Sequence, residues 1–391
     1  MMRVGFGVSA LCKGLAGGGL DGIGNYTREI LGQYKSPAFP LQPNLQLVPF
    51  AFGSPVPDAL AGSSGVTLGR YSVGAAWSAM TGANCPGIGR LAGQVDLIHA
   101  TDHYVPKCST VPVVATLMDA IPLSHPHWLR SDFRALKNAL WSRAARWADA
   151  VITISEYSRT ELTRWAGIEP SRITVIPLGV GQAWYRDVPQ AELERVGEKY
   201  RLSGTFFISV GTLQPRKNLA RTIQAHRALP DAVRRRCPLV IIGRAGWRCE
   251  DVLALIDQES GTDAVRWLQH VPDQDLLPVL KQATGLLFPS LAEGFGLPVV
   301  EAFAAQVPVI TSNTTSLPEV AGDAALQVDP LDIDALSAAM TSLLQDGDLA
   351  ERLRRRGLAR ARQLTWQACA QATAGVYAAV LAAQAGNQRR A

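Results

Sequence analysis

Two glutamates frame a short glycine-containing segment whose residue types suit the binding of a sugar or a phosphate. The segment runs EGFGLPVVE from Glu293 to Glu301, and seven residues separate the two carboxylates. A carboxylate accepts two hydroxyl hydrogen bonds at once, and free N–H groups at a helix start hold anions. The backbone groups available to such a ligand belong to Gly294, Phe295, Gly296 and Leu297. Either glutamate taken alone would fit a helix-capping or surface role equally well.

A second motif, GTLQPRKNL, places two adjacent cations behind a proline-stiffened turn. Arg216 and Lys217 follow the apolar run Phe206–Gly211 and precede an expected helix start. Cations at that place, together with the helix dipole, favour a diphosphate ligand. The alternative is a solvated basic pair.

A third motif is the glycine-rich stretch before an expected helix that begins near Tyr26. Its Gly22 and Gly24 would let backbone N–H groups approach an anion. A dinucleotide fingerprint also needs an acidic residue about twenty positions later. Leu47–Phe50 offers none, so NAD binding is disfavoured, and a plain flexible turn is the competing interpretation.

These motifs must be positioned by strands that are apolar at nearly every position and alternate with helical stretches, a pattern typical of buried parallel sheets. The first series of expected strands is Val4–Val8, Leu45–Phe50, Val95–Ala100, Val111–Leu117, Ala150–Ser155 and Ile173–Ile176. The second series is Phe206–Gly211, Leu239–Gly243, Val265–Leu268, Gly285–Phe288, Val307–Thr311 and Ala325–Val328.

Two such series predict an α/β protein with two Rossmann-like, doubly wound domains. The boundary is expected near residue 190, in the Pro/Gly-marked interval Pro177–Ser203. The predicted divisions are 1–190, 191–365, and a C-terminal helix over 366–391 that crosses back to the first domain. Ligands of open α/β sheets bind beyond the carboxyl ends of the strands, so an interdomain cleft is expected.

Composition narrows the class of protein. Apolar residues make up 47% of the 391 and charged residues 18%, which excludes a largely disordered chain. The net charge of +5 comes from basic residues spread along the chain, unlike the basic stripe of a nucleic-acid binder. The six cysteines show no metal-ligand spacing, which favours reduced thiols. Leu364–Gln388 is broken by glutamines and has helical periodicity, so a docked helix is favoured over a membrane span.

The sequence resembles the family-four retaining glycosyltransferases with the GT-B fold. EGFGLPVVE, GTLQPRKNL, IIGRAGW and SLPEVAGDAALQVDPLD carry the resemblance in the second half, and DGIGNYTREIL, ISEYSRTEL and ITVIPLGV agree more loosely in the first. The likeness is closest to mannosyl- and rhamnosyltransferase-like members that build cell-surface polysaccharides.

The resemblance implies that residues 1–190 bind the acceptor and residues 191–365 the nucleotide-sugar. It also implies a role for each matching residue. Lys217, with Arg216 as its partner, would hold the donor diphosphate, and Glu293 would contact the transferred sugar. Residues 294–297 would offer backbone groups to that sugar, and Glu301 would bond the ribose. Gly22 and Gly24 would lie against the phosphates and the acceptor.

Two positions depart from the family pattern. Many members have a histidine at the position of Met118, where it supports the donor sugar, and an arginine at the position of Thr212. Methionine cannot supply that polar contact, so Asp119 or His103 is expected to compensate. An aspartate after a strand is equally typical of a turn.

Two further features have structural explanations. Asp332-Ile333-Asp334 spells a metal-binding DxD, but Asp332 at the start of a helix is better explained as an N-cap. His125 and His127 have no third ligand nearby in sequence. No metal site and no cofactor are therefore expected.

The segment Leu129–Ala148 is expected to be a helix with one face formed by Phe133, Leu136, Leu140, Ala144 and Trp147. The other face would carry Arg130, Arg134, Lys137 and Trp141. Basic residues beside an aromatic suit an anionic membrane interface, and the alternative is a solvated helix face.

Taken together, the expectation is a retaining, metal-independent hexosyltransferase. The donor would be a nucleotide-sugar, with GDP-mannose favoured, and the acceptor a glycan or lipid-linked saccharide hydroxyl. A UDP- or dTDP-sugar donor, or a catalytically silent sugar-nucleotide-binding protein, is the alternative. The expected location is the cytoplasm, with peripheral contact to the inner membrane face; nucleic acid is not an expected partner.

Overall fold

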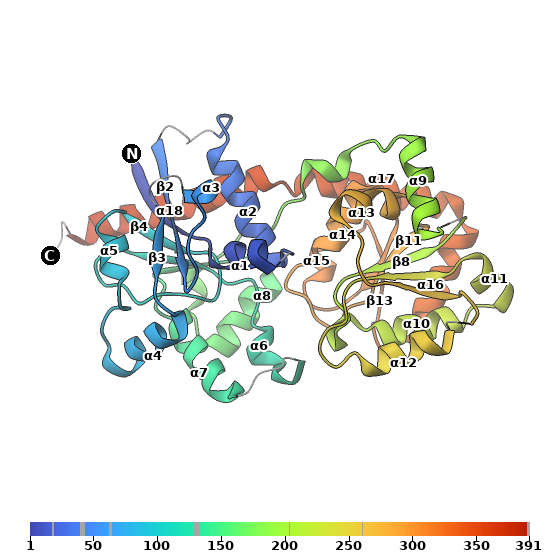
Figure 1. Ribbon diagram of the computed structural model, residues 1–391, viewed down its shortest axis with the longest axis horizontal. Coiled ribbons are helices and arrows are strands. Elements are labelled where there is room, and N and C mark those ends of the chain that lie inside the picture. The colour runs from blue at the N-terminus through green and yellow to red at the C-terminus, as the bar shows by residue number, and fades with distance from the viewer. Residues whose placement is uncertain are drawn as a thin grey trace. The chain divides into compact units, whose positions relative to one another are not determined.

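Both predicted series of strands form parallel sheets in the computed structural model, which describes residues 1–17, 19–39, 44–61, 65–128, 133–202, 204–259 and 261–388. The chain divides into two compact units (Figure 1). Unit 1 comprises Met1–Pro126, Ser131–Gly179 and Trp366–Ala391, and unit 2 comprises His127–Arg130 and Val180–Thr365.

The sheet of unit 1 has seven strands in the order β3-β2-β1-β4-β5-β6-β7, all parallel. Its strands are β1 (Met2–Gly7), β2 (Leu45–Phe52), β3 (Val66–Leu68), β4 (Leu97–Ala100), β5 (Val113–Thr116), β6 (Ala150–Thr153) and β7 (Ile173–Val175). The sequence analysis missed β3, because this edge strand has three residues and its central Thr67 is exposed.

The sheet of unit 2 has six parallel strands in the order β10-β9-β8-β11-β12-β13. Its strands are β8 (Phe207–Val210), β9 (Leu239–Ile242), β10 (Val265–Leu268), β11 (Gly285–Phe288), β12 (Val309–Ser312) and β13 (Leu326–Val328). All six were predicted, with shifts of one or two residues at some ends. The two sheets confirm the α/β fold class with two Rossmann-like domains.

Helices connect the strands in both units. Unit 1 contains α1 (Ser9–Gly17), α2 (Gly22–Lys35), α3 (Asp58–Ala61), α4 (Tyr71–Thr81), α5 (Ile88–Ala92), α6 (Ile121–Ser124), α7 (Arg134–Ala145), α8 (Glu156–Glu161), the π-helical turn η3 (Leu162–Ala166) and α18 (Trp366–Gln388). Unit 2 contains α9 (Gln190–Tyr200), the turn η6 (Pro215–Lys217), α10 (Leu219–Arg227), α11 (Asp231–Arg236), α12 (Glu250–Glu259), α13 (Asp273–Lys281), α14 (Leu297–Ala304), α15 (Leu317–Ala321), α16 (Ile333–Gln345) and α17 (Gly347–Gln363). No helix within the described ranges is long and apolar enough to cross a bilayer.

The glycine-rich stretch after β1 is more helical than predicted. Helix α1 occupies Ser9–Gly17, and α2 already begins at Gly22 rather than near Tyr26. Asp21 is the reason, because its carboxylate accepts a hydrogen bond from the N–H of Gly24 at 2.7 Å and caps α2. Gly22 and Gly24 therefore lie in the first turn of a helix, and the expectation of an open loop around them was wrong.

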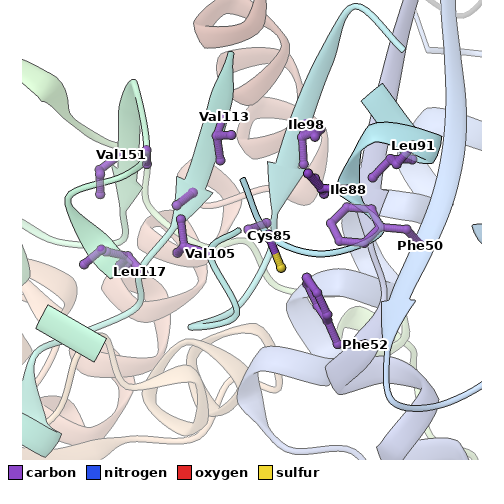
Figure 2. Packing of buried hydrophobic residues seen from close by; sticks show 14 of the residues in the cluster. Phe50, Phe52, Cys85, Ile88, Leu91, Ile98, Val105, Val113, Leu117 and Val151 are labelled. Carbon is purple, nitrogen blue, oxygen red and sulfur yellow. The ribbon is translucent and has the colours of Figure 1, made fainter. Parts of the chain in front are cut away.

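Buried side chains of unit 1 pack between the sheet and its helices. Figure 2 shows Phe50 and Phe52 of β2 beside Ile88 and Leu91 of α5, with the strands of the sheet continuing the cluster. The rings of Phe50 and Phe52 meet edge to face. This core explains why β2, β4 and β5 have almost no polar residues, since both faces of a parallel sheet are covered.

Helix α18 belongs to unit 1 although the preceding α17 belongs to unit 2. A buried polar chain fixes it there: the Tyr377 hydroxyl lies 2.6 Å from His99 Nδ1, and His99 Nε2 lies 2.8 Å from Thr116 Oγ1. Tyr26 from α2 also reaches the Thr116 hydroxyl, at 2.9 Å. Burial lowers the pKa of His99 to about 3, so this imidazole is neutral at physiological pH.

Helix α7 differs from its predicted form. It begins at Arg134 instead of Leu129, and Arg130 lies outside the described residues. Trp141 does not share an exposed basic face, because its indole packs against the core of unit 1 and meets the His103 ring at 5.2 Å. Phe133 and Leu136, from the predicted apolar face, are exposed.

The polar chain at α18 generates a stability prediction. Tyr377→Phe leaves a buried imidazole nitrogen without a partner, which should lower the free energy of unfolding by about 1–3 kcal/mol. Urea denaturation followed by circular dichroism measures this change. Gln371→Ala, on the exposed side of the same helix, is the matched control and should change stability by less than about 0.5 kcal/mol. Equal stability of Y377F and the wild type would contradict the inferred role of this chain.

Candidate active site

Two loops that follow neighbouring strands of unit 2 are joined directly. Asn218, which follows η6 and has a left-handed φ of 58°, donates from Nδ2 to the carbonyl oxygens of Pro289 at 3.0 Å and Pro330 at 2.6 Å. The Leu291 N–H donates to the Arg216 carbonyl at 2.8 Å. The loop after β8 is thereby held against the loop after β11, at the carboxyl edge of the sheet.

A glycine permits the close approach of a third loop, which follows β9. A Cβ atom at Gly243 would lie 2.1 Å from the carbonyl oxygen of Gly211, and its φ of 147° is one that other residues rarely adopt. The segment IIGRAGW, one of those that carry the family resemblance, therefore contains a glycine because a side chain at that position would collide with the backbone of Gly211.

Three of the predicted site residues meet between these loops. Glu293 accepts a hydrogen bond from Lys217 Nζ at its Oε1 and another from Arg216 at its Oε2, both at 2.6 Å. The Glu293 side chain is 9% exposed and that of Lys217 is 12% exposed. Lys217 Nζ also lies 4.4 Å from the centre of the Phe288 ring. The tertiary structure thus brings together residues that are about 76 positions apart in sequence.

Burial and ion pairing shift the pKa values of Lys217 and Glu293. Desolvation lowers the pKa of Lys217 to about 8, with Glu293 opposing the shift and Arg216 adding to it. Burial would raise the pKa of Glu293, but the two neighbouring cations outweigh it and hold that pKa below its usual range. One carboxylate between two cations leaves a net positive charge beside the strand ends.

The glycine segment is held by hydroxyl groups from the next loop. Ser316 Oγ donates to the carbonyl oxygens of Glu293 at 2.8 Å and Phe295 at 3.2 Å. Gly296 precedes α14 with a φ of 110°, and no side chain of the described residues caps that helix. The first N–H groups of a helix have no intrahelical acceptor, so this end of α14 suits an anion or a hydroxyl.

Glu301 lies one turn inside α14, as the sequence predicted. Its side chain is half-buried, and burial raises its pKa to about 7, with Asp273 adding to the shift. No hydrogen bond is recorded between Glu301 and the described side chains around it, in contrast to the doubly paired Glu293.

The remaining predicted residues lie in unit 1. Asp119 follows β5, and its carboxylate accepts a hydrogen bond from the Ile121 N–H at 3.0 Å, a turn geometry. Met118 is buried. His103 lines a pocket of about 350 Å³, together with Asp102, Tyr104, Lys13 and Asp21.

Sequence reasoning missed most of this pocket. Lys13 comes from α1, where no helix was expected, and its ammonium donates to the Tyr104 hydroxyl and lies over the Tyr104 ring. Asp102 is almost fully buried, accepts from the Tyr104 N–H at 2.8 Å, and has a pKa raised mainly by burial. The N-capping aspartate Asp21, directly before a helix, was the one local signal available in the sequence.

The DxD sequence acts as predicted. Asp332 Oδ1 accepts a hydrogen bond from the Ala335 N–H at 2.8 Å, which makes it the N-cap of α16. Within the described residues, no group of three or more potential metal ligands gathers here or elsewhere.

The Glu293 cluster generates the second prediction. Glu293→Gln leaves two largely buried cations without their counter-charge, which should lower the free energy of unfolding by about 3 kcal/mol. Denaturant titration checks the value. Glu198→Gln, an exposed change on α9, serves as the matched control. A variant as stable as the wild type would show that the carboxylate does not offset the two cations.

Comparison with known proteins identifies the family. Residues 192–360 match the model of glycosyl transferases group 1, and residues 74–182 match that of Glycosyltransferase Family 4. The chain is 38% identical over 231 residues to the O-antigen chain mannosyltransferase B of Escherichia coli, a match covering 59% of this chain and 60% of that protein. It is 31% identical over 310 residues to a glycogen synthase of Mycobacterium tuberculosis, covering 75% of this chain and 70% of the synthase.

The fold is also found in solved structures. Sucrose-phosphate synthase from Thermosynechococcus elongatus superimposes with a TM-score of 0.74 and 18% identity, covering 98% of this chain and 100% of the other. That likeness supports the GT-B fold, and the sequence matches support the family. The chain therefore belongs to the group 1 glycosyl transferases, in glycosyltransferase family 4.

Proposed function

We propose that this protein transfers mannose from GDP-mannose to a hydroxyl of a glycan or lipid-linked saccharide, with retention at the anomeric carbon and without a metal. The observation that carries the proposal is the Glu293 carboxylate held between Lys217 and Arg216 at the carboxyl edge of the unit 2 sheet. Similarity to an O-antigen chain mannosyltransferase favours mannose as the sugar. The proposal that the nucleotide base is guanine comes from the family resemblance.

Lys217 and Arg216 would bind the donor diphosphate. Charge develops on the diphosphate as the glycosidic bond breaks, and cations already in position stabilise it without reorganisation. A leaving phosphate oxygen would accept the proton of the attacking acceptor hydroxyl on the same face. The acceptor oxygen would form the new bond to the anomeric carbon as the bond to phosphate breaks.

Glu293 and Glu301 would bind different parts of the donor. Glu293 and the backbone of residues 294–297 would contact the sugar, and Glu301 would accept hydrogen bonds from the ribose hydroxyls. The difference in their surroundings supports this division, since Glu293 is doubly paired with cations while the charged neighbour that shifts the pKa of Glu301 is the carboxylate of Asp273.

The unit 1 pocket would hold the acceptor. Lys13, Asp102, Tyr104 and Asp21 supply donors and acceptors suited to sugar hydroxyls, and the Tyr104 ring adds a flat apolar face. Gly22 and Gly24 lie in the α2 turn that Asp21 caps, beside this pocket. Asp119 would compensate for Met118 at the reacting sugar.

Nucleotide preference gives the third prediction. GDP should raise the melting temperature more than UDP or dTDP at equal concentration, and a nucleotide at 100 times its Kd adds about 2.7 kcal/mol to the stability. Thermal-shift titration measures this, with Lys217→Ala as the binding-deficient variant. A larger increase in melting temperature with UDP or dTDP would show that the donor carries that nucleotide instead of GDP. Binding without any sugar transfer would favour a silent sugar-nucleotide-binding protein.

The lowered pKa of Lys217 gives the fourth prediction. The residue is charged below about pH 8 in the free protein and loses its proton above that value. Affinity for the nucleoside diphosphate should therefore fall as the pH rises through 8. Calorimetric titrations at several pH values test this, and Lys217→Arg should remove the decline because guanidinium stays charged. If K217R shows the same decline in affinity, a titrating group other than Lys217 causes it.

Metal independence gives the fifth prediction. The two cations beside Glu293 provide positive charge that a metal would otherwise supply, and Asp332 is engaged as an N-cap. Transfer should retain its rate in the presence of EDTA. Loss of activity that manganese restores would contradict the proposal.

A further inference from the structure

The loop after β12 presents two consecutive hydroxyl side chains to the glycine segment of unit 2. Ser316 is buried, and its Oγ donates to the carbonyl oxygens of Glu293 at 2.8 Å and Phe295 at 3.2 Å. Thr315 Oγ1 accepts a longer hydrogen bond, at 3.4 Å, from the Glu293 N–H. This loop therefore holds the main chain of Glu293 at both its N–H and its carbonyl group.

The backbone of Thr315 has an uncommon conformation. Its φ of 60° lies in the left-handed region, where a β-branched residue is rarely found because its Cβ crowds the backbone. In an extended strand, consecutive side chains point to opposite faces, so a sharp turn is needed for two successive hydroxyls to reach one residue. Strained positions of this kind cluster at functional sites, where neighbouring contacts maintain them.

Helix α15 holds Ser316 in place. Ser316 occupies the N-cap position of α15, which packs beside α14 (Figure 1). Arg360 of α17 binds the other end of α15, where its guanidinium donates to the carbonyl oxygens of Glu319 at 2.7 Å and Val320 at 3.0 Å. A cation at a helix C-terminus satisfies carbonyl groups that have no intrahelical partner. The Ser316 hydroxyl is therefore carried by a helix that is anchored at its far end.

The two hydrogen bonds from Ser316 also set the direction of two N–H groups. In a planar trans peptide the C=O and N–H bonds point in opposite directions. The Glu293 carbonyl shares its peptide group with the N–H of Gly294, and the Phe295 carbonyl shares its own with the N–H of Gly296. Because both carbonyl groups point toward Ser316 Oγ, both of these N–H groups point away from it. Two N–H groups that face the same way suit a ligand rich in oxygen atoms.

We propose that Ser316 is a positioning residue for the donor sugar: its hydroxyl aims the N–H groups of Gly294 and Gly296 at hydroxyl oxygens of the sugar, which accept the hydrogen bonds. Glycine permits many backbone orientations, so without the Ser316 hydroxyl the same segment would sample others. Holding the donors in the bound geometry beforehand raises affinity, because less ordering is needed on binding. The inference rests on the proposed function, in which the backbone of residues 294–297 contacts the transferred sugar.

The test compares the affinities of the full chain for GDP-mannose and for GDP, measured by calorimetric titration without an acceptor. If the thermal-shift titration selects another nucleotide, its sugar conjugate and its diphosphate replace these two probes. Ser316→Ala should weaken binding of the nucleotide-sugar about tenfold, because two hydrogen bonds to the sugar lose their support. Affinity for the nucleoside diphosphate should change less than about twofold, since the cations proposed to hold the phosphates are unaltered.

Ser312→Ala is the matched control. Ser312, the last residue of β12, is also buried, and its Oγ donates to the carbonyl oxygen of Ser290 at 2.7 Å, outside the glycine segment. This variant loses a hydrogen bond of the same kind, so its melting temperature should fall about as much as that of S316A. Its affinities for the nucleotide-sugar and for the nucleoside diphosphate should both equal those of the wild type.

The possible outcomes separate the role of Ser316 from the proposed function. Equal weakening of both ligands in S316A would show that the hydroxyl supports the fold of unit 2 and does not position groups for the sugar, which would overturn the proposal. Unchanged affinity of S316A for the nucleotide-sugar would also overturn it, while leaving the proposed function intact. A wild-type protein that binds neither ligand would refute the proposed function, and the role of Ser316 with it.

Discussion

A carboxylate removed from water must be compensated by cations or hydrogen bonds, and Glu293 satisfies that requirement with both Lys217 and Arg216. The three side chains come from loops that follow β8 and β11, so their meeting depends on those strands being neighbours in the sheet. Asn218 supports the arrangement by bonding two carbonyl oxygens from other loops. The parallel sheet thus serves chiefly to bring three charges to one edge.

The same compensation would make the cluster responsive to the proposed diphosphate ligand. Lys217 is held near its titration point by burial, and a phosphate anion beside it would favour the charged form. Glu301 has a pKa raised by burial and by Asp273, and no ion pair joins it to a cation among the described residues, so its electrostatic setting one turn into α14 is the opposite of that of Glu293. Two carboxylates in one short motif therefore have different protonation behaviour because their neighbours differ, which is the basis for assigning them to different parts of the donor.

Unit 1 uses buried polar groups for a different purpose. The chain from Tyr377 through His99 to Thr116 carries no charge and is sealed from solvent, so it fixes α18 on the sheet instead of binding a ligand. By contrast, Lys13, Asp102 and Tyr104 open onto a pocket.

The amino-acid sequence by itself determined the alternating strands, the parallel sheets, the N-cap at Asp332 and the motifs around Lys217 and Glu293. Those features follow from local patterns: apolar runs, glycine positions and capping residues act within a few residues of one another. Only the tertiary structure decided that Lys217 and Arg216 share one carboxylate, that Tyr377 meets His99, and that Trp141 faces inward while Trp77 faces out. Such pairings depend on strand order and helix rotation across about 70 to 280 positions of sequence, which a local pattern does not encode.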